Sequence, residues 1–116
     1  MRAFLCSLAL ISLSASAATP LEAYQKRLSD SIGREWYLRI EPHRDQLKPG
    51  TTRITFAISR EGTLQNIKIL SNTSDEQAAF AAVDSIKHAN IQPPPTDAFK
   101  TKNVFEEDLK FTIYPK

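Results

Sequence analysis

The first segment with helical spacing of apolar residues begins close to residue 20. One face of it is apolar at positions three or four residues apart, namely Leu21, Tyr24, Leu28 and Ile32. Thr19 suits the N-cap, Pro20 suits the first helical position, and Glu22 completes a capping box. We therefore predict a helix from about Pro20 to Trp36 or a little beyond. Trp36, the only tryptophan, either covers the core between this helix and a sheet or anchors a partner protein.

A second helix is predicted to begin soon after residue 72. Two capping boxes are available at its start, Thr73 with Glu76 and Ser74 with Gln77. Its buried stripe is expected to consist of Ala79, Val83 and Ile86, with Phe80 beside them. Pro93–Pro95 cannot continue a helix. We expect these prolines to form an extended surface connector, and the alternative is a polyproline ligand for another protein.

Two strands joined by a tight turn are predicted between the helices. Thr52–Ile58 alternates strictly, and one side of it carries Ile54, Phe56 and Ile58. The turn Ser59–Thr63 is expected to place Gly62 at a positive φ. In the returning strand, Leu64–Leu70, we assign Ile67 and Ile69 to the inner side. The pair therefore predicts an antiparallel hairpin with one apolar face.

The third strand predicted from the sequence is Glu107–Tyr114. Its inward residues are Leu109, Phe111 and Ile113, and these alternate with Lys110, Thr112 and Tyr114. The order helix, strand, strand, helix, strand predicts an α+β fold. We expect a three-stranded antiparallel sheet in the spatial order second-first-third, with two helices on its one apolar face. The last strand is then an edge of the sheet.

The first residues have the order of charged, apolar and small residues that is typical of a secretory signal peptide. Arg2 precedes an apolar stretch of 11 residues, Ala3–Leu13, and Ala15–Ala17 has the form of a cleavage motif. The alternative is an uncleaved anchor, but spanning a bilayer takes roughly 20 apolar residues. We expect residues 1–17 to be removed, with cleavage after Ala17 or Ala18, and residues 18–116 to form one periplasmic domain without stable membrane insertion.

Cysteine usage and charge narrow the possible functions. Cys6 is the only cysteine, so a chain cleaved after Ala17 has neither a disulfide nor a cysteine metal site. The whole chain has 15 basic and 13 acidic residues, evenly mixed. Nucleic acid binding requires a basic stripe, and none is visible. We expect no nucleic acid partner.

Candidate catalytic residues do not form a recognisable group in the sequence. His43 lies near Asp45, and His88 lies near the predicted end of the second helix, but neither belongs to a known spacing of nucleophile and base. The acidic run Glu106–Asp108 is interpreted as a solvated face. No metal-ligand spacing or phosphate-binding glycine loop is present. We therefore expect no enzymatic activity, no cofactor and no metal.

The ordered elements resemble the C-terminal domain shared by TonB and TolA, the periplasmic energy-coupling proteins of Gram-negative bacteria. The resemblance spans about Leu21 to Tyr114, and the matching pieces are the helix leading into Trp36, Ile54–Leu64, Ile67–Ser71, Ala78–Ala89, Pro93–Pro95 and Phe111–Ile113. It departs from the family at Ser71-Asn72, where Ser-Gly is usual. The membrane anchor and long spacer of force-transmitting members are also not seen after the predicted cleavage, so we expect a binding domain that does not draw on the proton gradient by itself.

The resemblance implies that the sheet edge pairs with an extended segment of a periplasmic or outer-membrane protein. Independently of it, an open sheet leaves unpaired backbone groups that a partner strand can satisfy. The candidate site is the last strand, with residues Leu109, Lys110, Phe111, Thr112, Ile113 and Tyr114. The alternative is a solvated edge blunted by Lys110 and Pro115. The same edge could also pair two copies of the chain in a weak homodimer. The alternative function is a small secreted inhibitor or envelope assembly factor with a similar fold.

Overall fold

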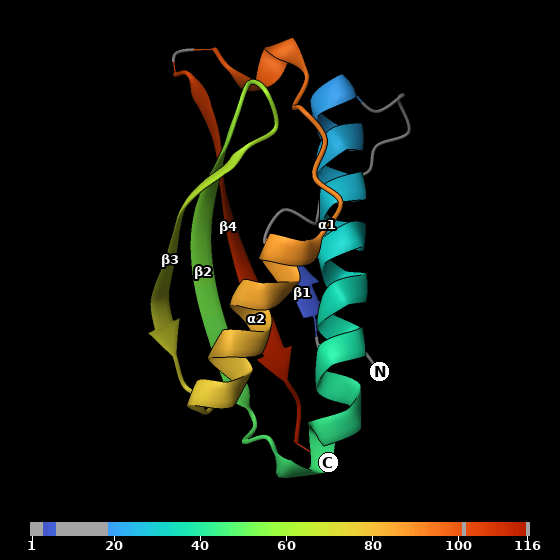
Figure 1. The fold of residues 1–116 in the computed structure, drawn as a ribbon, viewed down its shortest axis with the longest axis vertical. Coiled ribbons are helices and arrows are strands. Elements are labelled where there is room, and N and C mark those ends of the chain that lie inside the picture. The colour runs from blue at the N-terminus through green and yellow to red at the C-terminus, as the bar shows by residue number, and fades with distance from the viewer. Residues whose placement is uncertain (1–3, 7–18, 101, 116) are drawn as a thin grey trace.

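A computed structural model of the chain describes residues 4–6, 19–100 and 102–115. It has two layers, an antiparallel sheet and two helices that lie on the same face of it (Figure 1). The strands are β1 (Phe4–Cys6), β2 (Gly50–Ser59), β3 (Leu64–Asn72) and β4 (Val104–Ile113). The helices are α1 (Pro20–Ile40) and α2 (Glu76–His88), with short 3₁₀ turns η1 (Glu41–Gln46) and η2 (Thr96–Ala98).

The sheet order is β1-β4-β2-β3. The predicted α+β fold, with two helices and a three-stranded antiparallel sheet in the order second-first-third, is confirmed by β3, β2 and β4. Strand β1 is an addition that the sequence did not predict, and it lies in the segment assigned to the signal peptide. Of that segment, residues 1–3 and 7–17 lie outside the described part of the chain, and of β1 only the backbone path is described.

Helix α1 starts as predicted. The Glu22 backbone N–H donates to the Thr19 hydroxyl at 3.1 Å, and the Thr19 N–H donates to the Glu22 carboxylate at 3.0 Å. The helix is longer than expected because its buried face continues to Ile40 at four-residue spacing: Tyr24, Leu28, Ile32, Trp36 and Ile40. The burial of this continuous face outweighs the low helix propensity of Gly33.

Helix α2 starts differently from either predicted capping box. Its N-cap is Asp75, whose side chain accepts the Ala78 N–H at 2.9 Å, while the Thr73 hydroxyl accepts the N–H of Thr51 at 2.8 Å. The buried stripe consists of Ala78, Ala79, Ala82, Ser85 and Ile86. Ala79 and Ile86 are therefore correct, whereas Val83 is only partly buried and Phe80 is 59% exposed.

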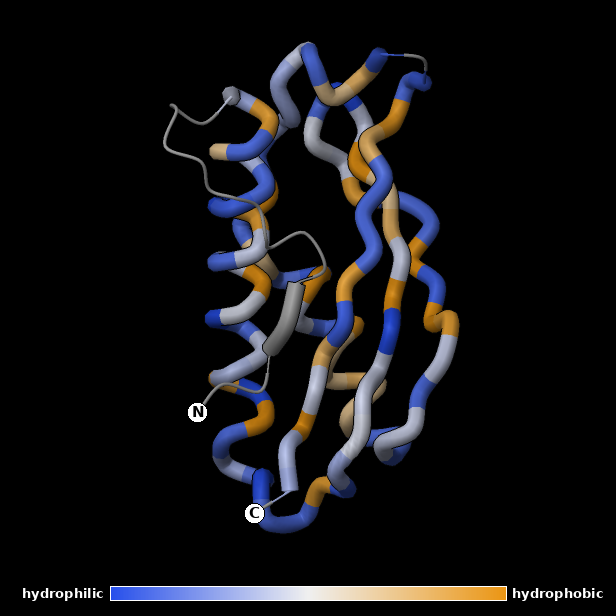
Figure 2. The backbone as a smooth tube through the Cα atoms, turned by 180° about the vertical axis from the view of Figure 1, so that it is seen from behind, coloured by the Kyte–Doolittle hydropathy of each residue, from blue (hydrophilic) through white to orange (hydrophobic). Residues whose placement is uncertain are grey.

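The ladder between β2 and β4 is regular, with consecutive pairs from Gly50↔Ile113 to Ser59↔Val104. The ladder between β2 and β3 has two register shifts, and Asn66 in the second has a φ of 54°. Ile69 lies between these two shifts and is 45% exposed, so its predicted inward position is wrong, whereas Ile67 is partly buried and packs against the core. Hydrophobic and hydrophilic positions alternate along the strands in Figure 2.

The core lies between the sheet and the helices. Trp36 is fully buried, and its ring lies 5.1 Å from that of Phe111 on β4 in an edge-to-face arrangement. Tyr24 and Phe105 make a similar contact at 5.9 Å. Trp36 is therefore a core residue that joins α1 to β4. Among the described residues, no helix is both long and apolar enough to cross a bilayer.

Candidate partner-binding edge of the sheet

The direction of the β4 backbone groups follows from two hydrogen bonds on the other side of the sheet. Thr51 donates its N–H to the Thr73 hydroxyl at 2.8 Å, and its carbonyl accepts the Thr73 N–H at 2.9 Å. Both backbone groups of Thr51 thus point away from β4, so Thr51 and Thr112 form a non-hydrogen-bonded antiparallel pair. It follows that the N–H and C=O of Thr112, and by alternation those of Lys110 and Asp108, point away from β2 toward the opposite edge.

Strand β1 lies along this edge. It pairs antiparallel to β4 with Phe4 opposite Phe111, Leu5 opposite Lys110, and Cys6 opposite Leu109. In the described chain β4 is therefore an inner strand, although the sequence placed it at the edge. Since β1 belongs to the predicted signal peptide, cleavage at residue 17 would make β4 the outermost strand on this side.

The structure places the predicted site residues on both faces of β4. Leu109, Phe111 and Ile113 are buried against the helices, as the alternation predicted. Lys110 is exposed, and Thr112 is partly exposed with its hydroxyl 3.1 Å from that of Thr51. Tyr114 lies beyond the end of β4 and is 42% exposed. The site thus combines an apolar inner face with a polar outer face.

The two sides of the sheet differ in regularity. The outer strand β3 carries both register shifts, near Leu70 and near Asn66, and such bulges disrupt pairing with an additional strand. Strand β4 pairs with β2 without a shift over its whole length, so its outward groups keep regular spacing. Of the two sides, the β4 side is thus the better template for an additional strand.

The acidic run at the start of β4 is not the uniformly solvated face that the sequence indicated. Glu106 pairs with Lys102 at 2.9 Å, and Asp108 pairs with Arg53 at 2.6 Å on the outer face of the sheet. Glu107 instead belongs to the inner face and is only 7% exposed. Leu109, Phe111 and Ile113 alternate at every second residue on the inner face. Continued toward the start of β4, the same alternation predicts that Glu107 also lies on the inner face.

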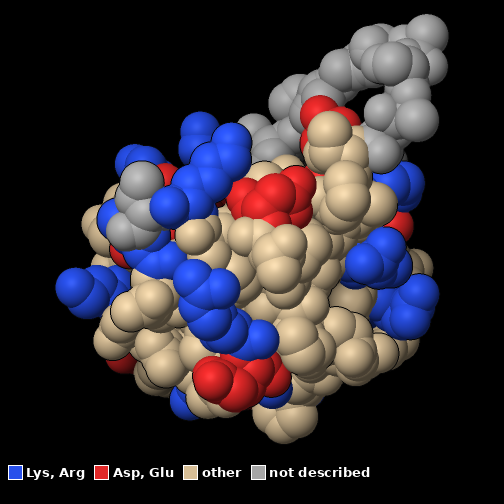
Figure 3. All heavy atoms as spheres, turned by 90° about the horizontal axis from the view of Figure 1, so that it is seen from above, with Lys and Arg blue, Asp and Glu red and all other residues tan. Residues whose placement is uncertain are grey.

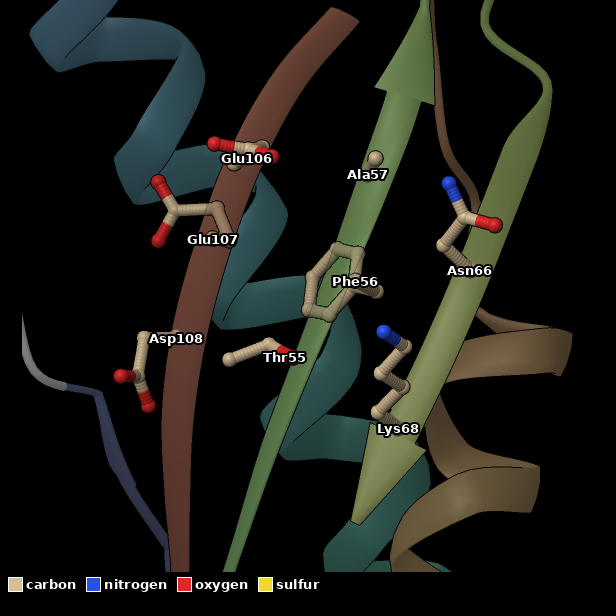
Figure 4. A pocket seen from close by; sticks show the side chains of 8 residues that line it. All are labelled: Thr55, Phe56, Ala57, Asn66, Lys68, Glu106, Glu107 and Asp108. Atoms are coloured by element: carbon tan, nitrogen blue, oxygen red, sulfur yellow. The ribbon is translucent and has the colours of Figure 1, made fainter. Parts of the chain in front are cut away.

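The Glu107 carboxylate accepts hydrogen bonds from uncharged donors. The Gln25 side-chain amide on α1 donates to its carboxylate at 3.0 Å. Burial raises the pKa of Glu107, and the hydrogen bonds from Gln25 and from the Asp108 backbone N–H oppose that rise only in part. Among the described residues, no Lys or Arg forms an ion pair with it. Figure 4 shows Glu107 on the side of β4 that faces away from β2.

The flank of α1 beside this edge carries Leu21, Gln25, Ser29 and Gly33 at four-residue spacing. The contact of Gln25 with Glu107 identifies the flank as the one that faces the β4 edge. The opposite flank lies on the side of α2: α1 contacts α2, and the Ser31 hydroxyl accepts the N–H of Asn90, two residues after the end of α2, at 2.9 Å. Helix α1 also contacts β1. The inner side of a strand added to β4 therefore lies against α1.

Besides a sheet edge, a pocket or a cluster of metal-ligating side chains on the described surface could hold a ligand. A shallow depression on the outer face of the sheet is lined by Thr55, Phe56, Ala57, Asn66, Lys68 and Glu106–Asp108 (Figure 4). Within the described ranges no group of three His, Cys, Asp or Glu side chains is placed to hold a metal ion. Basic and acidic side chains lie next to one another on the end of the molecule seen in Figure 3.

Comparisons of the chain with known proteins found matches only among solved structures. No family model and no curated protein sequence matches it. Among solved structures, the solution structure of the Helicobacter pylori TonB C-terminal domain, residues 179–285, is similar to it with a TM-score of 0.49 and 18% identity. The match covers 89% of this chain and 98% of that domain.

Proposed function

We propose that residues 18–116 form a periplasmic protein-binding module, related in architecture to the C-terminal domains of TonB and TolA. The module binds an extended segment of an envelope protein by pairing it with β4 over Leu109–Tyr114. Backbone hydrogen bonds supply the affinity of such a contact, and side-chain pockets beside the strand supply its selectivity. Residues 1–17 act as a cleaved signal peptide, and their removal opens this edge.

The observation that carries the proposal is the position of β1. A segment of the same chain pairs in antiparallel register with the outward side of β4, opposite Leu109, Lys110 and Phe111. The edge therefore has the spacing and the access that an added strand requires. The regular β2–β4 ladder and the bulged β3 ladder favour this side of the sheet over the other.

Two substitutions at Thr112 test the edge. Thr112→Pro removes a backbone donor that points outward, whereas Thr112→Val keeps that donor. Both variants lose the hydroxyl contact with Thr51, so the comparison between them isolates the backbone N–H of residue 112, which only the proline variant lacks. The assay is capture of partners from an envelope extract by immobilised residues 18–116. We expect Thr112→Val to retain capture and Thr112→Pro to lose it, and equal capture by both folded variants would exclude this edge.

Processing and location need a separate measurement. We expect N-terminal sequencing of the protein isolated from cells to begin at Ala18 or Thr19, and fractionation to recover it in the periplasm. Recovery of the chain with residues 1–17 attached, in the inner membrane fraction, would contradict the signal peptide. The β4 edge would then stay occupied by β1.

A further inference from the structure

Strand β4 extends beyond the stretch that pairs with the described part of β1. The described part of β1 ends with Cys6 opposite Leu109, two residues short of Glu107. Strand β4 continues to Val104 and pairs regularly with β2 over that stretch. A longer partner segment would continue along β4 past Leu109 and reach Glu107.

The residue of that partner opposite Glu107 would lie on the inner side of the sheet. In an antiparallel ladder, directly opposed residues point to the same face, and Glu107 points to the helix face. Since the backbone groups of Asp108 and Lys110 point outward, Glu107 would occupy a non-hydrogen-bonded pair, in which opposed side chains approach most closely. The partner side chain would therefore lie between Glu107 and the α1 flank that carries Gln25.

We propose that Glu107, positioned by Gln25, selects a lysine or arginine side chain at this position of the bound segment. This inference rests on the proposed edge pairing and names a feature of the partner. Of the three acidic residues at the start of β4, Glu106 and Asp108 already have the described cations Lys102 and Arg53. Glu107 has neutral hydrogen-bond donors instead.

The chemistry favours a cation over an apolar residue in this position. A carboxylate with only neutral donors in a buried site is incompletely compensated, as the raised pKa of Glu107 indicates. A partner ammonium or guanidinium group would stabilise the charged form through a charge-assisted hydrogen bond. A partner carboxylate in the same place would add a second negative charge and weaken binding.

The probe for the test is a synthetic peptide that copies residues 2–10 of this chain, with Cys6→Ser to avoid oxidation. If the peptide binds in the register of β1, its residue Leu8 lies opposite Glu107. Three forms are compared: the parent sequence, Leu8→Lys, and Leu8→Met as a neutral side chain of similar length. A Ser7→Lys peptide carries the same charge on the opposite face of the strand.

The protein for the test is residues 18–116. Every core residue in the described part of the chain lies between Tyr24 and Ile113, so this chain retains the whole described core. It is used as wild type, as Glu107→Gln, and as the matched control Glu106→Gln, which removes a neighbouring acid on the outer face. Dissociation constants are measured by isothermal titration calorimetry at low and at physiological salt.

We expect the Leu8→Lys peptide to bind wild type and Glu106→Gln about tenfold more tightly than the Leu8→Met peptide, a difference of about 1.4 kcal/mol. On Glu107→Gln the Leu8→Lys and Leu8→Met peptides should bind within about twofold of each other. The Ser7→Lys side chain would lie opposite Asp108, which already pairs with Arg53, so the affinity of this peptide should be the same for wild type and Glu107→Gln. Equal binding of the Leu8→Lys and Leu8→Met peptides to wild type would overturn the role of Glu107 and leave edge pairing intact. Failure of all peptides to bind would overturn the edge pairing and, with it, this inference.

Discussion

Truncation of Phe111 tests the contact that joins the site to the core. Phe111 is 1% exposed, and its ring packs edge-to-face on Trp36 with centroids 5.1 Å apart. Phe111→Ala leaves a cavity between α1 and β4, and such substitutions cost about 3–5 kcal/mol. A domain of this size has a free energy of unfolding of about 5–15 kcal/mol, so the loss is a large part of the total.

The assay is urea denaturation of residues 18–116 followed by the fluorescence of Trp36, the only tryptophan. With a slope of roughly 1–3 kcal/mol per molar urea, we expect the urea midpoint of Phe111→Ala to fall by about 1–5 M. The matched control is Phe80→Ala, since Phe80 is 59% exposed and its loss should change stability by less than about 0.5 kcal/mol. Equal midpoints for the two variants would refute the placement of Phe111 against Trp36.

Three further substitutions test local features. Gly50→Ala should destabilise the domain by about 1–3 kcal/mol, because an added Cβ would lie 2.6 Å from backbone atoms of Thr73 and Ser74, and wild-type stability would contradict that packing. Thr19→Ala should cost about 1 kcal/mol in thermal unfolding through loss of the capping box of α1. Glu107 binds its proton more tightly folded than unfolded, so its contribution to stability is present below its ordinary pKa of 4.5 and is lost as pH rises through the raised value. The stability of Glu107→Gln relative to wild type should therefore increase from pH 4 toward neutral pH, and a pH-independent difference would count against the burial of this carboxyl.

Elements with strong periodicity were predictable from the sequence alone. Helix α1 has a capping box at Thr19 and an apolar face at regular spacing, so its start and its buried face follow from local signals. Strand β4 alternates without interruption from Leu109 to Ile113, and the structure buries the expected side. In both elements the local preferences and the tertiary packing agree.

The start of α2 was less predictable because several residues there can cap a helix. Asn72, Thr73, Ser74 and Asp75 all carry suitable side chains, and the choice depends on partners distant in the sequence. Thr73 is engaged by Thr51 of β2, which leaves Asp75 to cap the helix. An alanine-rich helix also gives a weak phase signal, because alanine is small enough for either face.

The burial of Glu107 was missed for a related reason. Its neighbours Glu106 and Asp108 suggested one solvated acidic run, and charge similarity outweighed the alternation of the strand. Its hydrogen-bond partner Gln25 is 82 residues away, so no local pattern contains the contact. Strand β1 could not be anticipated either, because its three residues belong to an apolar stretch without alternation.

Amide hydrogen exchange along β4 tests the proposed binding edge most directly. In residues 18–116 alone, the N–H groups of Lys110 and Thr112 should exchange quickly because they point outward, while those of Phe111 and Ile113 should exchange slowly because they point toward β2. Addition of the peptide that copies residues 2–10 should slow exchange at Lys110 and Thr112 and leave Phe111 and Ile113 unchanged. Unaltered exchange at Lys110 and Thr112 under saturating peptide would contradict strand pairing at this edge.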